Sequence, residues 1–268
     1  QEVMATCPFA PYYIHPYLTV SGTYYWIAYG TDDIAVWNGS TWTDVTRQVT
    51  GTLSGTINSS VTTITLSDAS AFPSSGTIAM GTQAIANGSS NGYEEVTYSG
   101  KSTNDLTGCT RSANSTTAAE HTTAYPVVPI GSTATGDSDY DANTTTRRWT
   151  VTNLNGVIVA TNGYDAPQTW PLNSSGIPEL TVPFVRLRNF PEGVECKAIR
   201  SFRTFLVGLN WTRTNEEPRL VKWSTEASYG NQPISWLESD ATLDAGEYEL
   251  SDTPGDIIDG LPLGDSFI

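Results

Sequence analysis

The sequence predicts an all-β protein. Short runs rich in β-branched and aromatic residues alternate with polar turns at intervals of about 8–12 residues, which is typical of sandwiches, barrels and propellers. No window shows the sustained 3.6-residue period of an amphipathic helix. Only 15% of the 268 residues are charged, against a usual share of about 25%. Gly, Ser, Thr and Asn fill the difference, as turn-rich β proteins require.

The first segment, residues 1–49, has the pattern of a β-meander. Strands are expected within Tyr24–Gly30, Asp32–Gly39 and Ser40–Arg47. The Asn38-Gly39 pair between two of these runs is a strong signal for a tight turn. The segment is therefore predicted to pair each strand with the next one along the chain.

The second segment, residues 50–132, has a different composition, dominated by Ser, Thr, Gly and Ala. Two strands are expected around the turn Asp68–Gly76 and two more around Gly100–Asp105. The alternation of polar and apolar residues in VTTITLS favours a small β module over a low-complexity linker. We interpret the segment as an inserted module.

The third segment, residues 133–268, returns to the meander pattern. The apolar run VIVAT lies between Asn155-Gly156 and Asn162-Gly163, two turn signals that predict a buried strand. Further strands are expected, in order, at Cys196–Phe202, Thr204–Trp211, Arg219–Ser224, Pro233–Glu238, Gly246–Ser251 and Asp256–Leu261.

Charge, cysteine content and hydropathy disfavour a nucleic-acid-gripping protein, a disulfide-rich protein and a membrane-spanning protein. The net charge of −15 and the pI near 4.3 disfavour a protein that grips a phosphate backbone. The cysteines Cys7, Cys109 and Cys196 form no C-x-x-C pair and read as free thiols or small core residues. No stretch approaches the roughly 20 apolar residues of a membrane span.

One acidic run resembles a calcium loop. Asp137, Asp139, Asp141 and Asn143 alternate, so their oxygens could converge on a hard cation. Two diagnostic positions of such a loop fail, because Ala142 replaces the glycine and Arg148 the bidentate glutamate. We interpret the run, from Asp137 to Asp141 and beyond, as a solvated loop.

No pattern of catalytic residues stands out. His15 and His121 belong to no hydrolase motif and read as surface or structural imidazoles. The neighbours Glu94-Glu95 and Glu216-Glu217 would point to opposite faces of a strand, so neither forms a glycosidase pair locally. Pairing of distant carboxylates stays open. We predict that the chain is not an enzyme, with no catalytic, cofactor-binding or metal-binding residues and no cofactor.

Five basic residues gather in one part of the third segment. They form either a local basic patch or a set of alternate exposed positions on strands. The residues are Arg186, Arg188, Lys197, Arg200 and Arg203.

Several motifs of the third segment occur together in a specific order: FPEGVECKAIRSFRTFLVGLN, RLVKWSTEA, ISW and GDIIDGLPLGDSFI. With them, the chain resembles the tail nozzle proteins of short-tailed bacteriophages, also called tail tubular or tail hub proteins. The resemblance covers residues 1–47 and 136–268 and leaves out the middle. Its second motif set comprises Arg148, Trp149, Leu154, Asn155, Gly156, Asn162, Gly163, Asp165, Pro167, Gln168 and Trp170.

The resemblance implies a propeller-like β-meander domain formed by residues 1–49 and 133–268, interrupted by the module at 50–132. It implies a structural virion protein, made in the host cytoplasm, that forms a homohexameric ring below a tail adaptor protein, with tail fibres as further partners. DNA would pass through the ring during genome ejection without specific binding. Family members usually continue past D-S-F-I, so we expect the chain to be truncated at its C-terminus, as part of a longer protein.

The alternative is a tail module that binds a host receptor glycan, or a tail-associated glycan hydrolase. The chain contains 8 Trp and 13 Tyr, and such amphipathic side chains suit a saccharide site as well as a subunit interface. Assembly into a large ring would separate the nozzle from this alternative.

Overall fold

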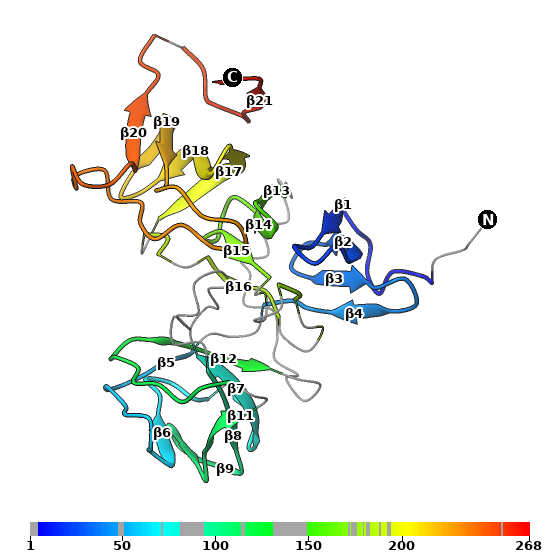
Figure 1. The fold of residues 1–268 in the computed structure, drawn as a ribbon, viewed down its shortest axis with the longest axis vertical. Coiled ribbons are helices and arrows are strands. Elements are labelled where there is room, and N and C mark those ends of the chain that lie inside the picture. Colours follow the sequence, from blue (N-terminus) through cyan, green and yellow to red (C-terminus); the bar gives the residue numbers. More distant parts are fainter. Residues whose placement is uncertain are drawn as a thin grey trace.

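The computed structural model describes residues 5–47, 51–70, 72–80, 94–113, 116–130, 149–170, 172, 176–178, 180, 183–187, 189–191, 194–252 and 254–268. These residues form strands and no helix, so the all-β prediction is confirmed (Figure 1). The strands make several antiparallel sheets, none of which closes on itself. Within this described part, no helix could cross a membrane.

The first sheet has four strands in sequence order: β1 (Tyr13–Leu18), β2 (Tyr24–Tyr29), β3 (Ile34–Trp37) and β4 (Trp42–Asp44). Three of them match the prediction. Strand β1 was not predicted, because Pro16 interrupts its sequence pattern. Pro16 is tolerated since β1 lies at the edge of the sheet, where a missing N–H need not break the ladder.

Two further four-stranded sheets also follow sequence order. One contains β13 (Thr150–Leu154), β14 (Val157–Thr161), β15 (Gln168–Thr169) and β16 (Val185–Arg186). The other contains β17 (Glu195–Phe202), β18 (Phe205–Thr212), β19 (Glu216–Trp223) and β20 (Gly246–Glu249). Strand β14 is the predicted buried strand, and Asn155 and Gly156 before it have φ of 50° and 92°, as the predicted tight turn requires.

Two predicted strands near the C-terminus are wrong. Pro233–Glu238 is a loop, whose Ser235 carbonyl accepts a hydrogen bond from Thr225 N–H. Asp256–Leu261 is also outside the strands and is followed by a small hairpin of β21 (Pro262–Leu263) and β22 (Ser266–Phe267). In both segments Pro or Gly residues limit hydrogen bonding between strands. Trp236 and Ile257 pack against the core without a strand, whereas Ile234, Leu237, Ile258 and Leu261 are exposed.

The module contains two sheets, of order β6-β10-β9 and β11-β8-β7-β12-β5. The strands on either side of Asp68–Gly76 exist as β6 and β7, but they belong to different sheets and do not pair. Around Gly100–Asp105 the prediction is correct only in part. The expected strands on either side exist as β8 and β10 but belong to different sheets, and the expected turn contains a further strand, β9, which pairs with β10. The bounds are β5 (Gly51–Thr52), β6 (Thr63–Thr65), β7 (Gly76–Met80), β8 (Glu94–Tyr98), β9 (Gly100–Ser102), β10 (Asp105–Thr107), β11 (Thr110–Ala113) and β12 (Pro126–Ile130).

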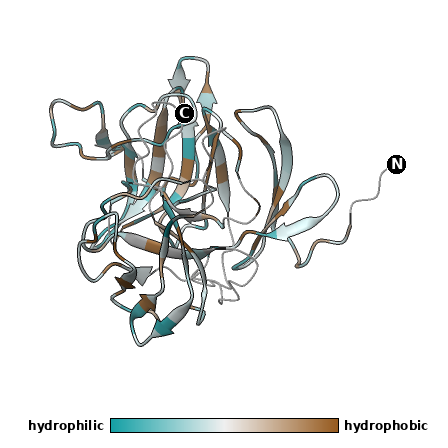
Figure 2. Cartoon of the chain, turned by 60° about the horizontal axis from the view of Figure 1, so that its bottom comes forward, coloured by the Kyte–Doolittle hydropathy of each residue, from teal (hydrophilic) through white to brown (hydrophobic). Residues whose placement is uncertain are grey.

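The buried side chains form separate clusters. The largest joins the three four-stranded sheets, and in Figure 1 the β13–β16 sheet lies between the other two. Tyr17 O–H donates to the Gly156 carbonyl (2.7 Å), and Trp149 Nε1 donates to the Gly30 carbonyl (2.8 Å). The module has a cluster of its own, built only from residues between Leu53 and Val127. Figure 2 shows hydrophobic and hydrophilic residues interleaved along the strands.

Candidate functional site

The residues that the sequence singled out do not converge on one site. The acidic run from Asp137 to Asn143 lies outside the described residues. His15 is half-buried on β1, and His121 is buried in the module, where it has a structural role. In the part of the chain that is described, no group of three His, Cys, Asp or Glu side chains could hold a metal ion. The cysteines are free thiols, and Cys109 and Cys196 are buried.

Glu94 is the centre of a buried charge cluster in the module. Arg111 donates to both of its carboxylate oxygens at 2.6 Å, and His121 Nε2 lies 3.1 Å from Oε2. The backbone N–H groups of Ser112 and Ala119 donate at 3.1 Å. Burial raises the pKa of Glu94, but the hydrogen bonds from His121, Arg111 and these amides outweigh burial and lower it to about 2.

This cluster is suited to holding the module together. An ionised Glu94 accepts, so His121 donates from Nε2, and the buried Nδ1 is left without a hydrogen-bond partner. A carboxylate with a pKa this low is a poor general acid near neutral pH.

The structure brings two distant carboxylates together on a buried lysine. Lys222 Nζ donates to Glu238 and, at 3.0 Å, to Glu247, which Arg213 also contacts at 3.3 Å. Lys222, Arg213 and Glu238 line a hollow of about 300 Å³. The hydrogen bond from Lys222 lowers the pKa of Glu238, whereas a glycosidase acid needs a raised pKa. The group is therefore better suited to joining β19, β20 and the loop at Glu238 than to catalysis.

Two members of the predicted basic cluster form ion pairs within the chain. Arg200 makes a two-pronged ion pair with Asp259, at 2.9 and 2.7 Å, and Arg203 contacts Asp265 at 2.8 Å. Lys197 Nζ donates to the Gly163 carbonyl. The side chains at positions 186 and 188 lie outside the described part. The described members therefore do not form an open basic patch.

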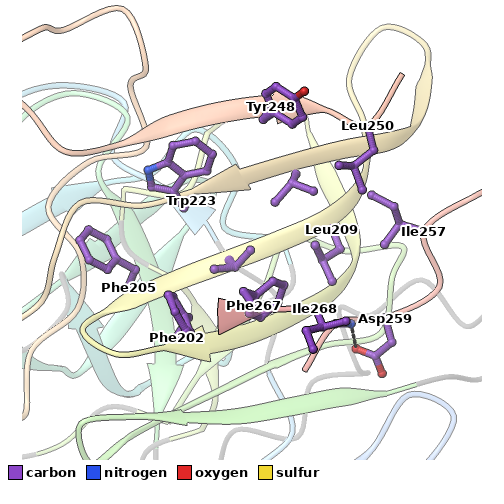
Figure 3. Close-up of a pocket in the computed structure, with 13 residues that line it drawn as sticks. Phe202, Phe205, Leu209, Trp223, Tyr248, Leu250, Ile257, Asp259, Phe267 and Ile268 are labelled. Atoms are coloured by element: carbon purple, nitrogen blue, oxygen red, sulfur yellow. Dashed lines mark hydrogen bonds between the residues drawn. The ribbon is translucent and has the colours of Figure 1, made fainter. Parts of the chain in front are cut away.

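A pocket of about 500 Å³ lies on the outer face of the β17–β20 sheet (Figure 3). Its lining is almost entirely apolar and includes the aromatic side chains of Phe202, Phe205, Trp223, Tyr248 and Phe267. A size of roughly 300–1,000 Å³ and an apolar lining are typical of ligand pockets. This pocket is the candidate functional site.

The strand register explains why these side chains meet. Residues directly opposite each other on neighbouring strands share a face of the sheet. Phe202 lies opposite Phe205, and Trp223 opposite Val207, so all four project to the same side. Tyr248 on the edge strand β20 lies opposite Val221, which extends the apolar face to that edge.

The segment 254–268 forms one wall of the pocket. It is held to the sheet by Ile257 N–H, which donates to the Pro218 carbonyl (2.8 Å), and by Asn210 Nδ2, which donates to the Ile257 carbonyl (3.0 Å). The ring of Phe267 packs against Phe202, with 5.8 Å between ring centroids. The wall is thus fixed by hydrogen bonds and ring packing as well as by the ion pairs of Arg200 and Arg203.

A glycine determines the position of the largest ring in the pocket. Gly246 lies opposite Trp223, and a Cβ atom built on it would lie 2.4 Å from Cζ2 of the indole. The indole therefore lies over the glycine, and its Nε1 donates to the Asp244 carbonyl at 2.9 Å. Any larger residue at position 246 would displace Trp223.

A second apolar surface lies on the outer face of the β1–β4 sheet. Trp26 lies opposite Trp37, and Trp37 opposite Trp42, so the three indoles form a row across β2, β3 and β4. Trp26 is 45% exposed, and Tyr24 on the same face is 68% exposed. These side chains carry no charge, so the surface suits an apolar or aromatic contact.

Sequence reasoning missed both surfaces. Each arises from a sheet that has apolar residues on both faces, one packed in the core and one open. Strands β2 and β18 contain apolar residues at consecutive positions. That signal could have shown that both faces are apolar, but it could not have shown which face is covered.

The comparisons with known proteins identify no relative. No protein-family model matches the chain, and no curated protein sequence matches it significantly. The resemblance to tail nozzle proteins thus stays a prediction from the sequence motifs.

Proposed function

We propose that this chain is a structural subunit of the tail nozzle of a short-tailed bacteriophage and forms part of the channel for genome ejection. The observation that carries the proposal is a stack of three four-stranded meanders, consecutive in sequence apart from the module, that share one core and leave an apolar face open at each end. The sequence motifs described above supply the family.

The three meanders suit successive blades of a propeller-like domain. Propeller blades are four-stranded antiparallel sheets that pack face to face. A free-standing antiparallel sheet has one polar face, whereas the β1–β4 and β17–β20 sheets are apolar on both. We infer that residues 1–49 and 133–268 form the propeller-like part and that residues 50–132 are a module inserted into it.

The aromatic face around Trp26 is our candidate for one side of the subunit interface. Exposed apolar patches mark sites of association. Each copy has a net charge of −15, and Asp44 is the one charged residue that the strands place on this face, so two copies can approach there with less repulsion. In a closed ring the contact is heterologous, and Trp26 of one copy meets a different surface on the next. The hexamer, the adaptor contact and the virion location rest on the sequence resemblance.

Electron microscopy and mass measurement of the purified full-length protein test this proposal. We expect a ring with a central channel, and a Trp26→Glu variant that remains a folded monomer. Tyr229→Glu is a matched control, because Tyr229 is also exposed, at 60%, but lies on another segment. A wild-type protein that stays monomeric at micromolar concentration would count against a ring-forming nozzle.

The receptor alternative also has a specific observation in its favour. The row of Trp26, Trp37 and Trp42 is a set of aromatic rings on a β-sheet surface, with 5.6 Å between the centroids of the last two. Aromatic rings can stack on the apolar faces of sugars. Binding of host envelope polysaccharide by a monomeric protein, lost in Trp26→Ala, would favour this function over the nozzle.

A further inference from the structure

The last part of the chain is strongly acidic. After Lys222 there is no Lys or Arg in the sequence. The same stretch supplies β20 and the wall segment of the apolar pocket. Its ten acidic residues are Glu226, Glu238, Asp240, Asp244, Glu247, Glu249, Asp252, Asp256, Asp259 and Asp265.

Two of these carboxylates are near pocket-lining residues in the sequence and are not paired. Asp252 and Asp256 are exposed and are close in sequence to Leu250 and Ile257, which line the pocket. Neither has an ion-pair partner among the described residues. By contrast, Asp259 inside the pocket is paired with Arg200. We call Asp252 and Asp256, which flank the lining residues in the sequence, the acidic rim of the pocket. The one carboxylate side chain that lines the pocket, Asp259, is paired.

We propose that this pocket binds a segment of a partner protein in which one large apolar side chain is flanked by Lys or Arg. The apolar side chain would fill the space between Phe205, Trp223 and Tyr248, where aromatic rings provide contact area. The flanking cations would lie against the carboxylates of Asp252 and Asp256. Apolar contact at the centre and opposite charges at the rim are typical of protein interfaces.

Charge disfavours two other occupants of this surface, a second copy of the chain and a nucleic acid. A second copy of the chain would bring another net charge of −15 to an acidic rim, and the two would repel each other. A nucleic acid would be repelled for the same reason. The inference goes beyond the proposed function, because it holds for a nozzle and for a receptor module alike.

The test uses three capped peptides with the full chain. The first is Gly-Lys-Lys-Phe-Lys-Lys-Gly, the second has Glu in place of each Lys, and the third has Ala in place of Phe. Calorimetry measures affinity at low and high salt, and the ¹⁵N–¹H signal of the Trp223 indole reports where the peptide binds. We expect the first peptide to bind about tenfold more tightly than either of the others, a difference in binding free energy of about 1.4 kcal/mol.

Protein variants then separate the two parts of the site. The double variant Asp252→Asn, Asp256→Asn should lower the affinity about fivefold and weaken its salt dependence, since screened charge pairs supply that part. Trp223→Ala should abolish binding, and Tyr248→Ala, at an exposed position on the edge strand, tests the same pocket if the first variant misfolds. Glu120→Gln removes an exposed carboxylate from the module and should change nothing.

Several results would overturn the proposal. Equal binding of the Lys and Glu peptides would show that charge does not select the occupant. An unmoved Trp223 signal, or no binding of the Lys peptide at millimolar concentration, would show that the pocket is not the site. A change of oligomeric state in Tyr248→Ala would assign the pocket to a second copy. Ring formation by the wild-type protein is measured separately, so failure of the nozzle proposal is distinguishable from failure of the peptide-binding proposal.

Discussion

Replacing Glu94 by Gln should destabilise the module far more than the rest of the chain. The substitution preserves the size of the side chain but removes its charge, and it leaves Arg111 buried without its carboxylate partner. Breaking a buried ion pair in this way costs about 3–5 kcal/mol. The loss should be local, because the buried residues around Glu94 belong to the cluster between Leu53 and Val127.

The buried cysteines allow this prediction to be measured separately in each core. Cys109 is buried in the module, and Cys196 is buried in the large cluster of the three meanders. Thiol labelling along a urea series, read by peptide mass spectrometry, gives an unfolding midpoint for each. At a slope of about 2 kcal/mol per M of urea, Glu94→Gln should lower the Cys109 midpoint by about 2 M and leave Cys196 unchanged. Glu120→Gln, at an exposed position, is the control.

The same carboxylate predicts how stability depends on pH. The pKa of Glu94 is lowered from 4.5 to about 2 in the folded chain. A carboxylate with a lowered folded pKa stabilises the fold above its unfolded pKa, and that contribution is lost as the pH falls towards the folded value. Lowering a pKa by one corresponds to about 1.36 kcal/mol, so the ionised Glu94 contributes about 3 kcal/mol to the free energy of unfolding. Hydrogen exchange of module peptides should therefore show a wild-type advantage over Glu94→Gln that shrinks between pH 4.5 and 2.

Two results would refute this reasoning. If both cysteine midpoints fall together in Glu94→Gln, the module does not unfold as a separate unit. If neither midpoint moves, Arg111 finds other partners or water at little cost, and the ion pair contributes little net stability.

Three further predictions follow from the same structure. Gly246→Ala should cost about 1–3 kcal/mol by displacing Trp223, measured by urea unfolding, whereas Gly255→Ala, with open space around it, should stay within about 0.5 kcal/mol of wild type. Excising the module and joining Arg47 to Gly136 through a short loop should leave a folded core. Its tryptophan fluorescence should stay native, since all eight Trp lie outside residues 50–132. An insoluble product would argue against a separable module. The purified protein should not retard duplex DNA in a gel at low salt, and tight, salt-sensitive binding would contradict a channel that releases DNA.

The sequence predicts the strands well where turn signals and apolar runs coincide. Asn155-Gly156 and the run that follows gave the tight turn and β14 correctly. Prediction failed where side-chain packing holds a segment that makes no backbone hydrogen bonds as a strand. Pro233–Glu238 is an example, because Trp236 is buried although the segment is a loop. It also failed at the pocket, because local patterns show that both faces of β18 are apolar but not which of them another sheet covers.

The turn from Asn162 to Trp170 shows what kind of information the nozzle-like motif holds. The Asn162 side chain accepts hydrogen bonds from the N–H groups of Tyr164 and Asp165, at 3.0 and 2.9 Å, and so fixes the turn. Asp165 then pairs with Arg47 at 3.1 Å, which ties this turn to the chain just before the module.

Trp170 at the end of the same motif is fully buried, and its ring packs edge-on against Tyr25, with 5.3 Å between centroids. Both contacts join the β13–β16 sheet to the first meander. Asp165 and Trp170, two of the residues that carry the resemblance, thus hold one sheet against the next. This part of the motif constrains how the sheets stack. The decisive experiment on the proposed function is therefore the assembly state, and the open aromatic face around Trp26 is the place to disrupt it.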